Sequence, residues 1–571
     1  MRTTSRTIAM PGTLARGSAI VVALAACLST SSACGGCSKK PDAPEGASPL
    51  DDVLASAKAA RAEAPVDVLP PVDVVAASPD PMEYKRFADE RPFFRALMAT
   101  PLVEELRLSG PLLALEGLRH QIAGVARFVG APNDGDALFV GPVAIGVRFV
   151  DDAEPRFVVA KRLDAQIAGV ARFAASFADI ARGATEALGQ DAPLLSSKEV
   201  AGVTVRSVAR GPVVVAFAFF KDLLVFGSDA QLVEQAVAIA AGEPGDVVPF
   251  VKGEGGRMLG ARGAKGVHIA HIGRAPAPAS TEGAASTEGK ASTPEGDAAR
   301  APVAGLLGAR ALGVSLVLDP EAPLVVRMTR DDAALGETDT LLKYAPTSAF
   351  AVIADGRAPA AVVTPLLADV LDAVDAVAAL RALADGLSPG VVAIAGALSP
   401  EESGADPAVV VVARHADRAA VEPRARALLD AVTPGALSRA VLDHAGGAVL
   451  FTSTTGPAIG VTDDAIVAGL DEARVRAALA SGAAAAPRLV DRAALTGSAP
   501  VALGLYLDVT RAGAFAERFY ASWAASDQGA PEGATATLAP TFAALRAGGH
   551  GAARLVDAKD GVFEGVFRVL P

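Results

Sequence analysis

The chain has 571 residues, of which 51% are hydrophobic, so its length and apolar content predict several folded units and exclude general disorder. It carries 52 lysines and arginines against 64 aspartates and glutamates, a net charge of −12. Because nucleic acid is bound through clustered basic side chains, this charge disfavours a nucleic-acid partner, and it equally disfavours adsorption onto anionic lipid headgroups.

The N-terminus has the pattern of a bacterial lipoprotein signal peptide. Three arginines, Arg2, Arg6 and Arg16, flank or precede an apolar run over residues 17–26, which is too short to span a bilayer. The run ends in Leu-Ala-Ala-Cys27, which resembles the lipobox of bacterial lipoproteins. That resemblance implies cleavage between Ala26 and Cys27 and a lipid on Cys27, which anchors the protein to a membrane. The alternative is an ordinary cleaved signal peptide with an incidental cysteine.

Leu28 follows the anchor cysteine, where an Asp would resemble an inner-membrane retention signal of some bacteria. We therefore expect an outer-membrane lipoprotein that faces the periplasm. Cys34 and Cys37 have CxxC spacing, but they lie in a Ser/Gly/Lys stretch without a predicted strand and helix around them. We interpret them as tether residues, and leave open whether they form a disulfide.

Two segments of biased composition separate the predicted folded parts. Residues 27–82, rich in Pro, Ala and acidic residues after the first few, predict a lipidated flexible tether with a short helix at 51–63. Residues 275–300 repeat a Ser-Thr-Glu-Gly unit without any large apolar side chain, and we expect a disordered loop there.

The most informative pattern is an internal duplication. Residues 222–236 and 464–478 both fit D-x-[LI]-V-x-G-x-D-x-x-x-V-x-x-A, which predicts a strand that turns into a helix. Asp229 and Asp471 are then helix N-caps, while Gly227 and Gly469 provide the sharp turn. Three further pairs of segments match in the same order: 143–145 with 392–394, 158–164 with 411–417, and 313–319 with 551–557.

Helical spacing of apolar residues predicts amphipathic helices over 167–188 and 365–383, which need a sheet to cover. We therefore predict an α+β fold made of two tandem related modules, each a largely antiparallel sheet backed by amphipathic helices. The first module spans 83–330, with N-terminal helices over 89–127 that have no counterpart in the other copy, and the second spans 331–571.

This arrangement resembles an uncharacterised family of duplicated bacterial cell-envelope lipoproteins of the domain-of-unknown-function type. The likeness covers residues 130–330 and 340–571 and rests on the repeated pattern above. The family has no established catalytic residues, so the resemblance implies none here.

A search for chemistry in the sequence predicts no catalytic residue, cofactor site or metal site. His268 and His271 are three apart in a predicted strand and so face opposite sides. The glycine-rich stretch 253–266 contains Arg257, Arg262 and Lys265, and we expect a mobile surface loop rather than an anion site. Asp463 and Asp464, like the pairs at 151–152 and 331–332, are adjacent at predicted turns, and adjacency alone indicates no shared site.

The sequence favours a non-enzymatic, lipid-anchored envelope protein that binds a partner protein or an apolar ligand. Two alternatives stay open: an envelope hydrolase whose active-site residues are dispersed along the chain, and an architectural spacer. A deep pocket with converging Asp, Glu or His favours the hydrolase, an open apolar groove favours binding, and the absence of both favours the spacer.

Overall fold

The computed structural model describes about three fifths of the chain, beginning at residue 59. The described residues are 59–61, 63–101, 103, 141–150, 155–162, 194–210, 213–260, 265–272, 309–319, 321–330, 335–362, 374–396, 408–433, 437–453, 456–483, 489, 495–497, 501–525, 534–559 and 561–570. The predicted signal peptide, Cys27, Cys34 and Cys37 lie outside them, as do the helix predicted at 167–188 and the loop predicted at 275–300.

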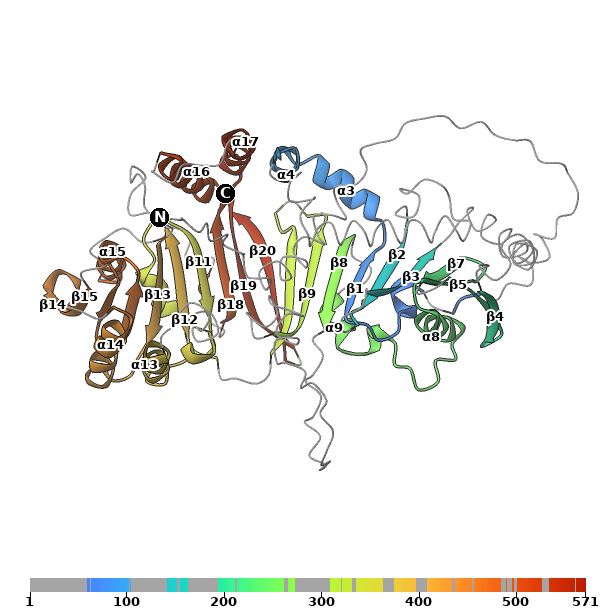
Figure 1. Ribbon diagram of the computed structural model, residues 1–571, viewed down its shortest axis with the longest axis horizontal. Coiled ribbons are helices and arrows are strands. Elements are labelled where there is room, and N and C mark those ends of the chain that lie inside the picture. Colours follow the sequence, from blue (N-terminus) through green and yellow to red (C-terminus); the bar gives the residue numbers. More distant parts are fainter. Residues whose placement is uncertain are drawn as a thin grey trace, which may run out of the picture. The chain divides into compact units, whose positions relative to one another are not determined.

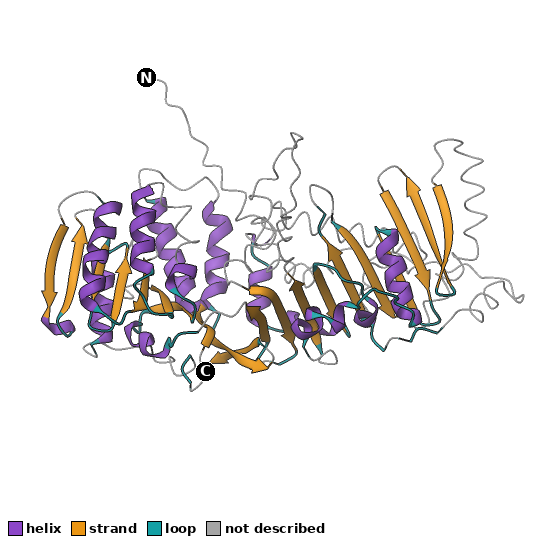
Figure 2. Ribbon diagram, turned by 90° about the horizontal axis from the view of Figure 1, so that it is seen from below, coloured by secondary structure: helices purple, strands orange, loops and turns teal. Residues whose placement is uncertain are grey.

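The described chain forms two compact units. The first contains Met1–Glu90, Leu106–Val303 and Arg310–Leu318, and the second contains Arg91–Glu105, Ala304–Ala309 and Asp319–Pro571. Helices and antiparallel strands make up both units, which confirms the predicted α+β class. Figure 2 shows the helices lying against the strands of each sheet.

The first unit is built on an antiparallel sheet with the strand order β9-β8-β1-β2-β3-β7-β6-β5-β4. Its strands are β1 (Val74–Ser78), β2 (Val143–Arg148), β3 (Arg156–Arg162), β4 (Leu194–Val200), β5 (Val203–Arg210), β6 (Val213–Phe219), β7 (Leu223–Gly227), β8 (Gly266–Ile272) and β9 (Ala309–Val317). Its helices are η1 (Pro65–Val68), α3 (Pro81–Asp89), α8 (Ala230–Ala241), η4 (Phe250–Lys252) and α9 (Glu254–Leu259).

The second unit has the order β10-β20-β19-β18-β11-β12-β13-β17-β16-β15-β14, again antiparallel throughout. Its strands are β10 (Leu324–Arg330), β11 (Ala349–Asp355), β12 (Val391–Gly396), β13 (Ala408–Arg414), β14 (Leu437–Leu442), β15 (Ala448–Ser453), β16 (Ala458–Val461), β17 (Ala465–Gly469), β18 (Val501–Asp508), β19 (His550–Lys559) and β20 (Val562–Leu570). Its helices are α4 (Pro92–Met98), η5 (Asp339–Tyr344), α13 (Val374–Ala384), α14 (Arg418–Val432), η6 (Asp443–Ala445), α15 (Glu472–Gly482), α16 (Val509–Ala524) and α17 (Ala534–Arg546). Figure 1 labels most of these elements.

Alternating side chains divide the core of the second unit between the two faces of its sheet. Val392 and Val467 pack in one apolar cluster with η5 and α15, while their chain neighbours Val391 and Ile466 pack in another with α13 and α14. Such alternation is the period-two pattern of a strand buried on both faces. Helices therefore cover both sides of this part of the sheet.

The duplicated motif forms a strand followed by a helix in both units, as predicted: β7 and α8 in the first, β17 and α15 in the second. The carboxylate of Asp229 accepts hydrogen bonds from Gln231 N and Leu232 N, and that of Asp471 accepts one from Arg474 N, so both residues are N-caps.

The predicted reason for the two glycines was wrong. Neither Gly227 nor Gly469 has a positive φ, so the turn does not require glycine for its backbone conformation. Close packing is the reason at Gly227, where a Cβ would lie 2.3 Å from the carbonyl oxygen of Phe157 on the neighbouring strand. At Gly469 the nearest atom, Cγ2 of Val475, would lie 3.1 Å away.

The predicted tether extends too far. Its C-terminal part forms η1 and then β1, which is hydrogen-bonded to β2 on one side and to β8 on the other. Val75 is buried in the sheet, and Val68 and Leu69 are buried just before it. A flexible tether to residue 82 is therefore ruled out from Pro65 onward, because these apolar residues belong to the core of the first unit.

Two other predicted segments are described in part. The helix expected over 365–383 is α13, described from Val374 to Ala384. The helical region expected over 89–127 includes α4, which belongs to the second unit and packs against α17. The second unit also contains β10, which pairs with β20, so the division after Leu318 lies upstream of the boundary expected at 330/331.

Candidate functional site

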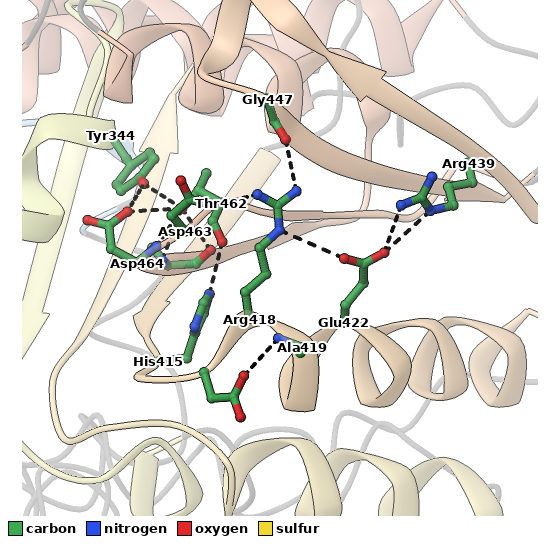
Figure 3. Close-up of polar contacts among 12 residues, drawn as sticks. Tyr344, His415, Arg418, Ala419, Glu422, Arg439, Gly447, Thr462, Asp463 and Asp464 are labelled. Atoms are coloured by element: carbon green, nitrogen blue, oxygen red, sulfur yellow. Dashed lines mark hydrogen bonds and ion pairs between the residues drawn. The ribbon is translucent and has the colours of Figure 1, made fainter.

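A network of polar side chains in the second unit brings several potentially reactive groups together. It is centred on the turn between β16 and β17, where Thr462, Asp463 and Asp464 lie (Figure 3). Tyr344 reaches it from the end of η5, His415 from the end of β13, and Arg418 from the first turn of α14. Segments distant in sequence thus meet at one turn.

The first part of the network surrounds Asp464. The Tyr344 hydroxyl donates to Asp464 Oδ1 over 3.2 Å and lies 3.1 Å from Thr462 Oγ1, while Lys343 Nζ is 2.7 Å from Asp464 Oδ2. Burial alone would raise the pKa of Asp464, but the hydrogen bonds from Lys343 and Thr462 outweigh it and hold that pKa below its ordinary value. Asp464 is therefore an ionised carboxylate at neutral pH.

Tyr344 has the opposite shift. Burial raises its pKa well above the ordinary value of 10.0, and the charges of Asp464 and Asp463 raise it further. The phenol therefore stays protonated at neutral pH and acts as a hydrogen-bond donor rather than as a nucleophile or base.

His415 is buried beside the same turn. Its Nε2 lies 3.1 Å from the carbonyl oxygen of Thr462, and because a carbonyl only accepts, Nε2 carries the proton. The backbone N–H of His415 donates to the carbonyl of Asp464, which ties the end of β13 to the turn. The imidazole thereby fixes the position of Thr462.

The second part of the network links α14 to the neighbouring strands. Arg418 donates to Asp463 Oδ1 over 2.5 Å and to the carbonyl of Gly447 over 2.8 Å. One turn later on α14, Glu422 accepts from Arg439 of β14 over 3.0 Å. These contacts join α14 to three separate chain segments.

The network is suited to holding elements together. The Asp464 carboxylate accepts hydrogen bonds from Lys343, Tyr344 and Thr462. The Thr462 hydroxyl in turn accepts one from the backbone N–H of Ala465. These hydrogen bonds tie η5 to the turn between β16 and β17, which is a structural role for the Asp464 carboxylate. Sequence reasoning missed the network because Tyr344 and His415 carry no motif and lie far from the turn in sequence.

The predicted histidine pair lies where the sequence placed it, in strand β8. Val267 and Ile269 pack against α3, so alternation puts His271 on that face and His268 on the other. His268 Nδ1 is 2.9 Å from Ser315 Oγ of the paired strand β9. Burial lowers the pKa of His271, which the charge of Asp73 partly opposes, so that imidazole is neutral at pH 7.

The glycine-rich stretch is not the surface loop that we expected. Its first residues form α9, in which a Cβ at Gly255 would lie 2.2 Å from the ring of Phe250 and one at Gly256 would lie 1.9 Å from the carbonyl oxygen of Val251. Lys265 pairs with Glu83 over 2.8 Å. The glycines thus allow α9 to pack closely, and Arg262 lies outside the described residues.

Two hollows on the second unit are open and lined by a mixture of charged and small or apolar residues. One, of about 410 Å³, lies over β19 and β20 and is lined by Arg554, Glu564 and Arg568 with smaller residues between them. The other, of about 270 Å³, lies between α14 and β14 beside Arg426 and Asp430. Their linings resemble a protein surface more than an apolar ligand pocket.

Within the described ranges, no three or more His, Cys, Asp or Glu side chains are grouped so as to hold a metal ion. No helix in the same part of the chain is long and apolar enough to cross a membrane.

Comparison of the chain with protein-family models, with curated proteins and with solved structures finds no match.

Proposed function

We propose that this chain is a bacterial envelope lipoprotein, anchored by lipid on Cys27, whose two tandem related α+β modules bind a partner protein without catalysing a reaction. The anchor rests on the signal-peptide pattern that ends in Leu-Ala-Ala-Cys27. The expected location is the outer membrane, facing the periplasm, because Leu28 rather than Asp follows the cysteine.

The relation between the two modules is supported by their strand orders. The first unit runs β9-β8-β1-β2-β3-β7-β6-β5-β4, and the second contains β19-β18-β11-β12-β13-β17-β16-β15-β14 in the same sequence of chain positions. A motif with an N-capping Asp recurs at the same place in both, before α8 and α15. Gene duplication accounts for both regularities.

The observation that carries the binding proposal is the pair of edge strands β4 and β14. Among the described strands, β4 pairs only with β5 and β14 pairs only with β15. Both edges carry exposed apolar side chains: Leu194 on β4 is 78% exposed and Val441 on β14 is 54% exposed. A strand edge offers a row of backbone donors and acceptors to an incoming extended peptide.

A partner protein fits these edges better than an apolar small molecule. An extended segment of a partner satisfies the backbone groups of the edge and covers its apolar side chains at once. The hollows over β19 and β20 and beside α14, in contrast, are open, and each has at least one arginine and a carboxylate among its lining residues.

Crosslinking in living cells with edge-blocking variants tests this proposal. A lysine at an edge position discourages strand addition, so L194K or V441K should reduce the yield of a specific crosslinked partner by about tenfold. The matched control is V409K, which places a lysine at a similarly exposed valine on β13, a strand paired on both sides.

Loss of the crosslink in an edge variant, with retention in V409K, supports binding through that edge. Reproducible absence of any crosslinked protein in the wild type contradicts the binding proposal and favours the architectural spacer. Equal yields of the crosslinked partner in the wild type, L194K, V441K and V409K exclude the two edge strands as the binding surface.

A further inference from the structure

A buried cluster of charge lies where β11 ends in the second unit. Asp355 is the last residue of β11, and Arg357 follows two residues later. Arg330, the last residue of β10, reaches the same carboxylate. All three side chains are at least nine-tenths buried, with 5% exposure for Arg330.

The carboxylate of Asp355 is held mainly by Arg357. Arg357 Nη2 lies 2.8 Å from Asp355 Oδ2, and Arg357 Nε lies 3.1 Å from Oδ1 and 3.0 Å from Oδ2. The backbone N–H of Arg357 also donates to Oδ1 over 2.9 Å. The guanidinium thus presents its Nε/Nη2 edge to the carboxylate, the side-by-side arrangement that suits two oxygens. Asp355 neutralises one of the two arginines.

Arg330 makes its hydrogen bonds through Nη1. Its Nη1 donates to the carbonyl of Ala502 over 2.7 Å and lies 3.4 Å from Asp355 Oδ1. Its Nε and Nη2, the same edge by which Arg357 holds Asp355, are shielded from solvent and have no hydrogen-bond partner in the part of the chain described. Two adjacent N–H donors are left without an acceptor.

Burial makes this arrangement costly without a further anion. Among the described residues, two guanidinium groups face the single carboxylate of Asp355, which cannot balance both positive charges in this shielded place. Burial and the neighbouring Arg357 lower the pKa of Arg330, with Asp355 opposing them, but a guanidinium remains charged at neutral pH. An unpaired buried charge is destabilising unless a counter-charge satisfies it.

We propose that the Nε/Nη2 edge of Arg330 binds a small oxyanion, either a carboxylate or a phosphate, through two parallel hydrogen bonds. The ligand supplies the missing negative charge and the two missing acceptors together. It is held by an arginine that Ala502 and Asp355 have already oriented.

The test is equilibrium dialysis of the detergent-solubilised full-length protein against radiolabelled acetate and, separately, radiolabelled orthophosphate. We expect about one bound oxyanion per chain. Chloride at equal concentration should compete only weakly, because a monatomic ion does not present two separate acceptor atoms to the two N–H donors. R330Q should lower the affinity at least about tenfold, as expected for loss of charge-assisted hydrogen bonds. Acetate binding alone identifies a carboxylate site, and phosphate binding alone identifies a phosphate site.

R330K and R327Q serve as matched variants. R330K keeps the positive charge but loses the two parallel N–H donors, so it should bind the anion as weakly as R330Q. If circular dichroism shows that R330Q does not fold, R330K replaces it in the test. R327Q removes an arginine from the same strand, where it pairs with Glu564 over 2.6 Å, and should bind like the wild type. The proposal is overturned if the wild type binds neither anion, or if R330K binds as tightly as the wild type.

Discussion

The ends of β1 and β11 occupy corresponding places in the two units and are built from different chemistry. Ser78 ends β1 opposite Val143, and Asp355 ends β11 opposite Val391. Ser78 is buried and donates to the carbonyl of Gly266 over 2.7 Å, whereas Asp355 is buried between two arginines. The same backbone pattern therefore tolerates a neutral hydrogen bond in one unit and a charged cluster in the other, so the charge is not required by the fold.

The largest expected effect comes from removing the two side chains that differ. D355A leaves Arg330 and Arg357 buried without their carboxylate and should destabilise the second unit by about 3–5 kcal/mol. S78A leaves one buried carbonyl unpaired and should cost the first unit only about 1 kcal/mol. Hydrogen exchange in a urea series, read by mass spectrometry on peptides of each unit, separates the two losses. Equal losses would show that the two strand ends are energetically equivalent.

Alanine substitutions at the two motif glycines should differ by a smaller amount in their cost to stability. A Cβ at Gly227 meets the backbone of β3, which cannot move without disturbing the sheet, so G227A should cost about 1–3 kcal/mol. A Cβ at Gly469 meets the end of the Val475 side chain, and G469A should cost well under about 1 kcal/mol. Urea unfolding of the two variants checks the order, and a larger loss for G469A would contradict the packing explanation.

Alanine substitutions at the two helix N-caps should differ by a still smaller amount in their cost to stability. Asp229 is 7% exposed, accepts two backbone hydrogen bonds and pairs with Arg156 over 2.7 Å. Asp471 is 44% exposed, accepts one backbone hydrogen bond and pairs with Arg474 over a longer 3.4 Å. Loss of a cap costs about 0.5–2 kcal/mol, so D229A should fall near the upper end and D471A near the lower end. D229N and D471N, which keep a capping side chain, are the controls and should be much milder. Exchange rates of amides in α8 and α15 report each helix separately.

The smallest expected effect is on acid stability. Burial opposes ionisation of Asp229 and Asp464, but hydrogen bonds from Arg156 and from Lys343 outweigh it and lower both pKa values. A lowered folded-state pKa contributes stability that is complete above the unfolded-state pKa, about 4, and is lost as the pH falls through the folded-state value. D229N and D464N should each flatten the loss of stability below about pH 4 in their own unit. An unchanged slope in unfolding free energy against pH would contradict the assigned shifts.

The local sequence pattern was enough to predict the strand, N-cap and helix that both units share. It was not enough to predict the features that differ between the units, such as the ends of β1 and β11. The strand, the N-capping Asp and the helix of each motif copy lie within about fifteen consecutive residues, where spacing and capping chemistry are informative. Ser78 carries no such signal, because its partner Gly266 comes from a distant strand. Arg357 lies only two residues after Asp355, but the second arginine of the cluster, Arg330, comes from another strand. Tyr344 and His415 escaped prediction for the same reason, since only the folded chain brings them to the turn at Thr462–Asp464.

Strand β1 shows how composition misleads when pairing is non-local. Its sequence, Val-Val-Ala-Ala-Ser, is short and follows a Pro-rich stretch, which is typical of a linker. Its stability comes from β2 and β8, whose residues begin about 70 and about 190 positions later. Gly227 was misjudged in a similar way, because the atom that excludes a side chain there belongs to Phe157.

The proposed identity as a lipid-anchored binding protein depends first on Cys27. Mass spectrometry of the N-terminal peptide from membrane-extracted protein measures it directly. The account predicts a chain that begins at Cys27 and carries a thioether-linked diacylglycerol. A mature chain that begins elsewhere, or an unmodified Cys27 thiol, would contradict it.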